Sequence, residues 1–173
     1  MKKIVFYIST AALFISPLTN AAWNTSIDKD EMTGEIRAYA NSPTIQSTKK
    51  MSFPYSSTRS WLGVGCNQKG EEWIYVGFTN APNLNGTETK DGYNLISTRV
   101  KWDNNIESTK LIQDWGSKFI HFRNDKNAIK NALKSNQMLL ELNWHSQGNQ
   151  YFKYSLNGSS AAIKTIRSKC KAS

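Results

Sequence analysis

The stretch that decides the fold runs from Met138 to Cys170 and reads MLLELNWHSQGNQYFKYSLNGSSAAIKTIRSKC. From Met138 to Trp144 every second side chain is large and apolar, which is the period of a β-strand with one buried face. The same period returns from Phe152 to Leu156, after a turn predicted at Gln147-Gly148-Asn149. These two runs therefore predict an antiparallel hairpin.

A helix is predicted directly after this hairpin. Asn157-Gly158 ends the second strand, and Ser159 or Ser160 can cap the helix that follows. Positions i, i+4, i+7 and i+11 form one stripe along it, made of Ser159, Ile163, Ile166 and Cys170. The stripe places Cys170 on the core side of the helix.

Further strands are predicted upstream. Leu62, Val64 and Cys66 share one face of a strand, and the small residues Gly63 and Gly65 on the other face indicate that something packs close to it. The next run, 73–78, is apolar on both sides and is predicted as a central strand between two packed layers. Other strand-like runs are 35–40, 93–102, 110–112 and 118–122.

The order of these elements predicts the fold class. A second helix is expected over Lys126–Ser135, capped by Asn124 or Asp125, with Asn136 as a left-handed stop. The polar runs 23–33 and 41–58 are interpreted as turn and connector. Seven or eight short strands and two short helices predict a mainly β fold, an antiparallel β-sandwich with the helices at its edges.

The first residues have the pattern of a secretory signal peptide. Lys2 and Lys3 precede an apolar run over 4–18, and small residues follow up to Ala21. A retained membrane anchor is the alternative, but the run is short for a bilayer span and is interrupted by Pro17. We therefore predict a signal peptide over 1–21 and a single domain over 22–173, exported to the periplasm of a bacterium.

Export places the two cysteines where oxidation is permitted. Cys66 and Cys170 are the only cysteines in the chain, and each ends an apolar segment. An intramolecular disulfide between them is therefore favoured over a metal site or a redox site.

The chain is strongly basic, with 22 Lys and Arg against 13 Asp and Glu. Two of these lysines lie in the predicted signal peptide, so the mature chain keeps a net charge of +7. Such a surplus favours anionic partners, namely lipid headgroups, lipopolysaccharide, cell-wall polymers or an acidic patch on an envelope protein. Export argues against nucleic acid. The alternative is that the charge only aids solubility.

The two predicted helices each carry a basic stripe opposite the apolar one. Its members are Lys126, Lys130 and Lys134 on the first helix and Lys164, Arg167 and Lys171 on the second. These six residues are the candidate surface for an anionic ligand. The alternative is that they form ordinary solvated faces.

No motif for catalysis, a cofactor or a metal is present in the sequence. His121 and His145 are the only histidines and are interpreted as strand residues. The acidic run at Asp30 lacks the ligand spacing of a calcium loop, and the adjacent Glu71-Glu72 would point to opposite faces of a strand. The six tryptophans could form a platform for sugar stacking, but a role in the core is favoured.

Several phrases together resemble one family of exported bacterial proteins, the VasI-type accessory proteins linked to type VI secretion and related small prophage proteins. They are Trp23 after the signal, Asp30-Glu31-Met32-Thr33-Gly34, the strand ending at Cys66, Arg99-Val100-Lys101-Trp102-Asp103, and the close from Tyr154 to Cys170. Where the family often has Asp-Leu-Ser-Gly before the last helix, this chain has Ser155-Leu156-Asn157-Gly158. The resemblance implies a periplasmic accessory role and carries over no catalytic residue.

Two functional hypotheses follow. The first is a non-catalytic periplasmic accessory or binding protein, associated with type VI secretion or with prophage-encoded modulation of the envelope, such as exclusion or immunity. The second is an enzyme that binds or modifies cell-wall or other glycans.

Overall fold

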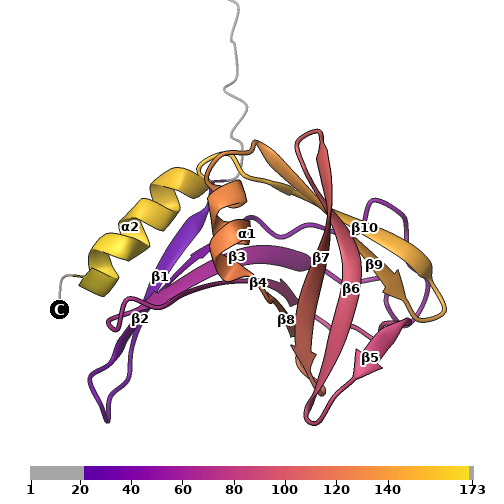
Figure 1. Ribbon diagram of the computed structural model, residues 1–173, viewed down its shortest axis with the longest axis horizontal. Helices are drawn as coiled ribbons and strands as arrows, with labels where there is room; N and C mark the ends of the chain where they lie inside the picture. The colour runs from indigo at the N-terminus through magenta and orange to yellow at the C-terminus, as the bar shows by residue number, and fades with distance from the viewer. Residues whose placement is uncertain (1–21, 172–173) are drawn as a thin grey trace, which may run out of the picture.

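The computed structural model describes residues 22–171, so the predicted signal peptide over 1–21 lies outside the described residues. Over these residues, ten strands and two helices follow each other along the chain (Figure 1). The strands are β1 (Asn24–Lys29), β2 (Ile36–Asn41), β3 (Ser60–Asn67), β4 (Glu72–Phe78), β5 (Thr87–Thr89), β6 (Tyr93–Trp102), β7 (Asn105–Asp114), β8 (Phe119–Phe122), β9 (Gln137–Trp144) and β10 (Gly148–Ser155). The helices are α1 (Asp125–Ala132) and α2 (Ser159–Lys171).

All strands belong to one antiparallel sheet. The order across it is β1-β2-β3-β4-β8-β7-β6-β9-β10, with β5 paired to β6, and the sheet does not close. The prediction of a mainly β fold with two helices and one disulfide is confirmed. The sandwich is built from one continuous sheet that folds over, rather than from two separate sheets.

The sheet folds over so that its last strand, β10, comes back near β3. Segment 44–48 lies between the two, because Ile45 forms an isolated bridge with Ser60 of β3 and Ser47 forms one with Phe152 of β10. The hydroxyl groups of Ser60 and Tyr154 are 2.6 Å apart and fully buried. These contacts create the two-layer packing that surrounds the core.

The β9–β10 hairpin has the predicted alternation, and the alternate side chains from Met138 to Trp144 are completely buried. The position of the turn, predicted at Gln147-Gly148-Asn149, was wrong. It spans 145–147, and Gly148 already pairs with Trp144 as the first residue of β10. The left-handed backbone of this turn is taken up by Ser146, at φ 61°, and by Gly148, at φ 67°.

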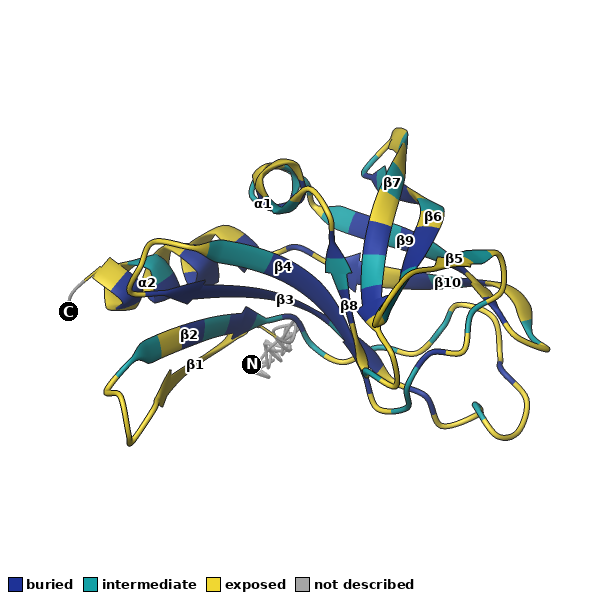
Figure 2. Cartoon of the chain, turned by 60° about the horizontal axis from the view of Figure 1, so that its bottom comes forward, coloured by how far each residue is buried: buried dark blue, intermediate teal, exposed yellow. Residues whose placement is uncertain are grey.

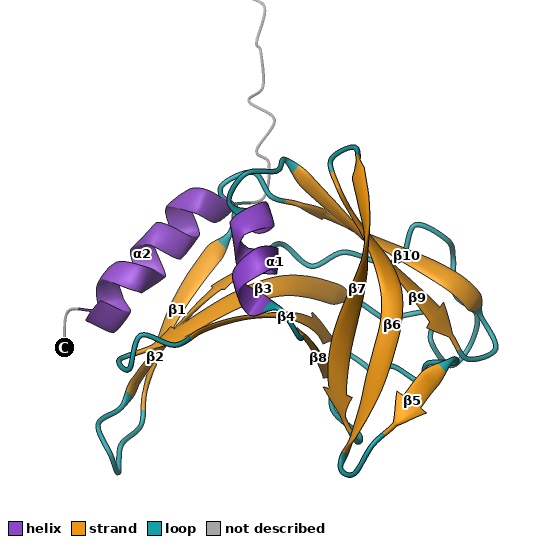
Figure 3. Cartoon of the chain, in the orientation of Figure 1, coloured by secondary structure: helices purple, strands orange, loops and turns teal. Residues whose placement is uncertain are grey.

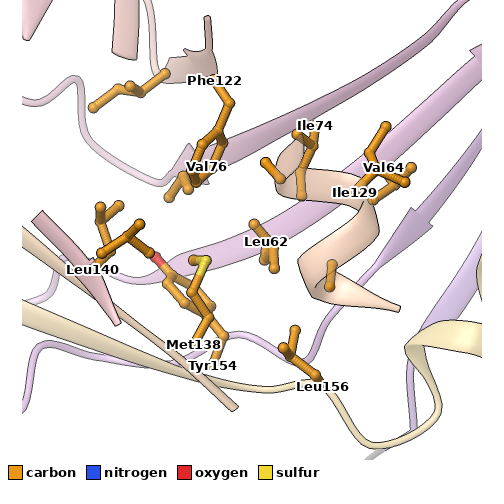
Figure 4. Packing of buried hydrophobic residues seen from close by; sticks show 14 of the residues in the cluster. Leu62, Val64, Ile74, Val76, Phe122, Ile129, Met138, Leu140, Tyr154 and Leu156 are labelled. Carbon is orange, nitrogen blue, oxygen red and sulfur yellow. The ribbon is translucent and has the colours of Figure 1, made fainter. Parts of the chain in front are cut away.

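Both helices cover the same side of the β1–β4 part of the sheet (Figure 3). Helix α2 buries the predicted stripe and packs on β1, β2 and β3, while α1 packs on β4 and β8. Ile129 of α1 belongs to one apolar cluster with Leu62, Val64 and Ile74 (Figure 4). The predicted disulfide is confirmed, since Cys66 of β3 is bonded to Cys170 of α2.

The first helix is shorter than predicted. It is capped by Asn124, as expected, but it ends at Ala132, and Leu133 rather than Asn136 is its C-cap. This end meets the start of α2, where the hydroxyl groups of Ser159 and Ser160 donate to the carbonyl oxygens of Ala132 and Leu133, at 2.8 and 2.9 Å. These bonds satisfy carbonyl groups that a helix end leaves without partners.

The polar run after Trp23 forms a strand, β1, although it was expected to be turn-like. Tertiary pairing with β2 overrides its low strand propensity. The turn that follows is shaped by Asp30, whose carboxylate accepts hydrogen bonds from the backbone N–H groups of Met32 and Thr33. The bond from Thr33 is the main reason why the pKa of Asp30 is lowered. Asp30 therefore has a structural role in this hairpin.

Candidate functional site

The side of the β1–β4 sheet that faces away from the helices carries the most distinctive surface of the protein. Figure 2 shows β3 and β4 as largely buried strands, and the exposed edge strand β1 is separated from them by β2. On β3, Leu62, Val64 and Cys66 face the core, so Gly63 and Gly65 face the opposite side. The expectation that something packs on these glycines is met by aromatic rings from the neighbouring strand.

Two indole rings lie across glycines of the adjacent strand. Trp73 of β4 covers Gly65 of β3, and Trp61 of β3 covers Gly77 of β4. A Cβ atom built at either glycine would lie 2.3 Å from Cε2, a carbon shared by the two rings of the indole. The atoms Cζ2 and Nε1 would be farther away. Each indole therefore turns one face toward the sheet and the other away from it.

A third ring lies between the two indoles. Tyr75 extends over Gly63 and donates a hydrogen bond from its hydroxyl group to Oδ1 of Asn41, at 2.8 Å. Burial raises the pKa of Tyr75 to about 12, so the hydroxyl stays neutral and remains a donor at physiological pH. This bond fixes the ring across β3.

Two more aromatic rings stand on edge beside this floor. The Tyr39 ring lies 6.0 Å from that of Trp73 at an interplanar angle of 73°, and the Phe119 ring lies 6.0 Å from that of Trp61 at 83°. Phe119 keeps 41% of its surface exposed. The floor and these walls form an open groove, called the aromatic groove below.

The aromatic groove has a volume of about 740 Å³. None of the described residues that line it is Asp, Glu, Lys or Arg. Besides the aromatic rings it is formed by Asn24, Thr25, Ser26, Asn41, Ser42, Thr44 and His121. An apolar floor with a few uncharged polar groups around it is the usual composition of a small-ligand site.

The tryptophans divide between the core and this surface. Trp23, Trp102 and Trp144 are buried, as the core interpretation predicted. That interpretation is wrong for Trp61 and Trp73, which are only partly buried and line the groove, while Trp115 lies elsewhere with 60% of its surface exposed. Segment 73–78 is a central and largely buried strand, as predicted, but the face that carries Trp73 and Tyr75 lines the groove and is not covered by a second packed layer.

Five of the six candidate basic residues are exposed in the helical layer. Lys126 and Lys130 lie on α1, Lys164 and Lys171 on α2, and Lys134 lies just past the end of α1. None of these five forms an ion pair with another described residue. Because α1 ends against the start of α2, they belong to one layer on the side of the sheet opposite the groove.

Arg167, the sixth candidate, is not available as a free charge. Its Nε and Nη2 atoms donate to the two carboxylate oxygens of Glu72, at 2.5 and 2.8 Å. This paired hydrogen bonding raises the pKa of Arg167 and ties α2 to β4. Of the six candidates, the five lysines are therefore the ones that remain outside ion pairs among the described residues.

The two histidines occupy different places. His121 of β8 lines the groove, with its ring 5.9 Å from that of Tyr75, whereas His145 lies in the β9–β10 turn with Nδ1 3.2 Å from Oδ1 of Asn85. Over residues 22–171, no three His, Cys, Asp or Glu side chains gather in a way that would hold a metal ion.

Comparison with known proteins gave no match to any family model, curated protein or solved structure. Within the described part of the chain, neither helix has the length and apolar character needed to cross a membrane.

Proposed function

We propose that this protein is a non-catalytic binding protein of the bacterial envelope, and that the aromatic groove is its ligand-binding surface. The observation that carries the proposal is the floor of aromatic rings laid on Gly63, Gly65 and Gly77. Glycine weakens a strand interior, and its presence there is typical of a close approach by another group. Three such positions on one face support selection for a flat aromatic surface, in which Tyr75 is buried and Trp61 and Trp73 stay partly exposed.

A periplasmic location is part of this proposal. The signal-like pattern of residues 1–21 supports it, as does the Cys66–Cys170 disulfide, since disulfides persist in oxidising compartments. An accessory role in type VI secretion, or in prophage-encoded modulation of the envelope, rests on the sequence resemblance alone.

The alternative is an enzyme that modifies a glycan in the same groove. Glycoside hydrolysis ordinarily uses two carboxyl groups on either side of the bond that is cleaved. The lining of the aromatic groove offers His121 and tyrosine hydroxyl groups but no carboxylate. This composition favours binding over hydrolysis.

Co-sedimentation with isolated bacterial envelopes tests the proposal. We expect the protein to sediment with the envelopes and the double variant Trp61→Ala/Trp73→Ala to stay largely in the supernatant, because the substitutions remove the exposed floor. Trp115→Ala is the matched control and should sediment like wild type, since Trp115 is exposed outside the groove. Sedimentation that the double variant leaves unchanged would contradict the proposal, and release of soluble sugar fragments would favour the enzyme.

We further propose that the five exposed lysines bind an anionic envelope component. The double charge reversal Lys130→Glu/Lys164→Glu should reduce co-sedimentation with anionic vesicles, and binding should weaken as salt rises. Exposed substitutions of this kind cost under about 0.5 kcal/mol of stability, so the fold should persist.

The control for this charge reversal makes the same change in net charge away from the helices. Lys50→Glu/Lys118→Glu alters two exposed lysines of other segments. Equal loss of vesicle binding in both double variants would mean that only net charge matters. Equal binding of wild type to neutral and anionic vesicles would reject an anionic ligand.

A further inference from the structure

We propose that the aromatic groove binds an extended oligosaccharide of uncharged sugar units, whose rings stack on Trp61 and Trp73. This inference rests on the proposed function, because it names the class of ligand for the same groove. It is carried by the length of the floor, the free faces of its indoles, and the absence of charge in its lining.

The floor is elongated along the strands. Trp73, Tyr75 and Gly77 are alternate residues of β4, and Gly77 carries the ring of Trp61, so three aromatic rings follow each other in this direction. Alternate residues of a strand are roughly 7 Å apart, which separates the two indole positions by roughly 13 Å. A ligand that contacts both indoles is therefore longer than one sugar ring and presents flat faces at intervals.

The indoles present faces rather than edges to this ligand. One face of each lies on a glycine, and the opposite face points into the groove, while Tyr39 and Phe119 stand nearly perpendicular at its sides. A pyranose ring has an apolar face of C–H groups that packs against an aromatic face, while its hydroxyl groups point outward around the rim. The flat rings of the floor and the upright rings of Tyr39 and Phe119 match the shape of a pyranose ring.

The polar groups at the rim are uncharged and include free donors and acceptors. The side chains of Asn24 and Ser26 make no hydrogen bond within the described part of the chain, and Asn41 has Nδ2 left over after accepting from Tyr75. The groove is uncharged on a chain with a net charge of +9. This contrast favours a ligand that bonds through hydroxyl and amide groups over an ionic one.

An extended peptide fits the floor less well. A peptide carries a main-chain donor and acceptor at almost every residue, and each needs a partner when it is covered. The floor strands β3 and β4 are flanked on both sides by other strands of the sheet, so their backbone groups are engaged. A sugar chain makes no such demand on the floor.

Calorimetric titration of the periplasm-purified protein tests the proposal, with the tetrasaccharides of β-1,4-linked N-acetylglucosamine and glucose as probes beside their monosaccharides. We expect saturable binding of at least one tetrasaccharide, about tenfold or more tighter than its monosaccharide. Trp61→Ala and Trp73→Ala should each weaken it about tenfold or more, as is typical for a tryptophan central to a binding site. Trp115→Ala should leave the affinity unchanged.

Variants that keep a ring separate stacking from folding. Trp61→Phe and Trp73→Tyr retain a flat aromatic face over Gly77 and Gly65, so they should bind more tightly than the alanine variants. Thermal unfolding of each variant shows whether the fold is retained. A loss of binding in a folded alanine variant that the aromatic variant partly restores supports stacking.

The outcomes distinguish this proposal from the one it rests on. The proposal of an oligosaccharide ligand is overturned if neither tetrasaccharide binds. It is also overturned if both alanine variants bind as the wild type does. If envelope binding then still depends on Trp61 and Trp73, the proposed function stands with another ligand, and protease sensitivity of the envelope would identify that ligand as a protein. If envelope binding is also independent of both tryptophans, both proposals fail.

Discussion

Replacing both cysteines, as in Cys66→Ala/Cys170→Ala, is expected to lower the free energy of unfolding by about 4 to 5 kcal/mol. The disulfide joins residues 104 positions apart, so it removes much of the conformational freedom of the unfolded chain. For a domain of this size the loss corresponds to a fall in Tm of roughly 10 to 20 °C. Thermal and urea unfolding of the wild type and the double variant measure it.

The control for this experiment lies on the same helix. Ser168→Ala removes a small polar side chain from the exposed face of α2 and should change stability by under about 0.5 kcal/mol. A cysteine-free variant as stable as this control would contradict the expectation and show that the disulfide adds nothing to the free energy of unfolding. In that case Ile163 and Ile166, which are also buried, would hold the helix in place without it.

The second large effect is expected at the centre of the folded-over sheet. Phe152 of β10 is completely buried, with its ring 5.3 Å from that of Phe78 and 6.0 Å from that of Trp144. Phe152→Ala removes these contacts and leaves a cavity, so it should cost about 3 to 5 kcal/mol of stability. Urea unfolding should show a lower midpoint with little change in slope.

Phe53→Ala is the matched control for Phe152→Ala, because Phe53 has 89% of its surface exposed. The same chemical change at this position should cost under about 0.5 kcal/mol. Similar losses at the two positions would contradict the assignment of Phe152 to the core between β10 and the β3–β4 layer.

Local periodicity predicted much of the fold. The alternation from Met138 to Trp144 indicated a strand with one buried face, and the stripe ending at Cys170 indicated a helix that buries its cysteine; both are confirmed. The disulfide could be predicted because Cys66 is the only possible partner for Cys170 in the chain and the first residues have the pattern of an export signal. These inferences succeed because period 2 and period 3.6 are properties of adjacent residues.

Element boundaries that depend on distant partners were predicted less well. β1 is too polar to be recognised as a strand, and it exists because β2 supplies its hydrogen bonds. Helix α1 ends at Ala132, where Ser159, 27 residues later, donates to a carbonyl group that the helix end leaves without a partner. Neither partner can be identified from the local sequence.

The sequence by itself determined that Gly63 and Gly65 leave one face of a strand bare, and that Trp73 and Tyr75 share a face of the next strand. Only the tertiary structure decided that these faces coincide, because the antiparallel register pairs Gly65 with Trp73 and Gly63 with Tyr75. Sheet order then placed β8 beside β4, which brought Phe119 to the edge of the floor. Alternation along a strand shows which side chains share a face, whereas register and strand order decide what lies beside them and whether water reaches them.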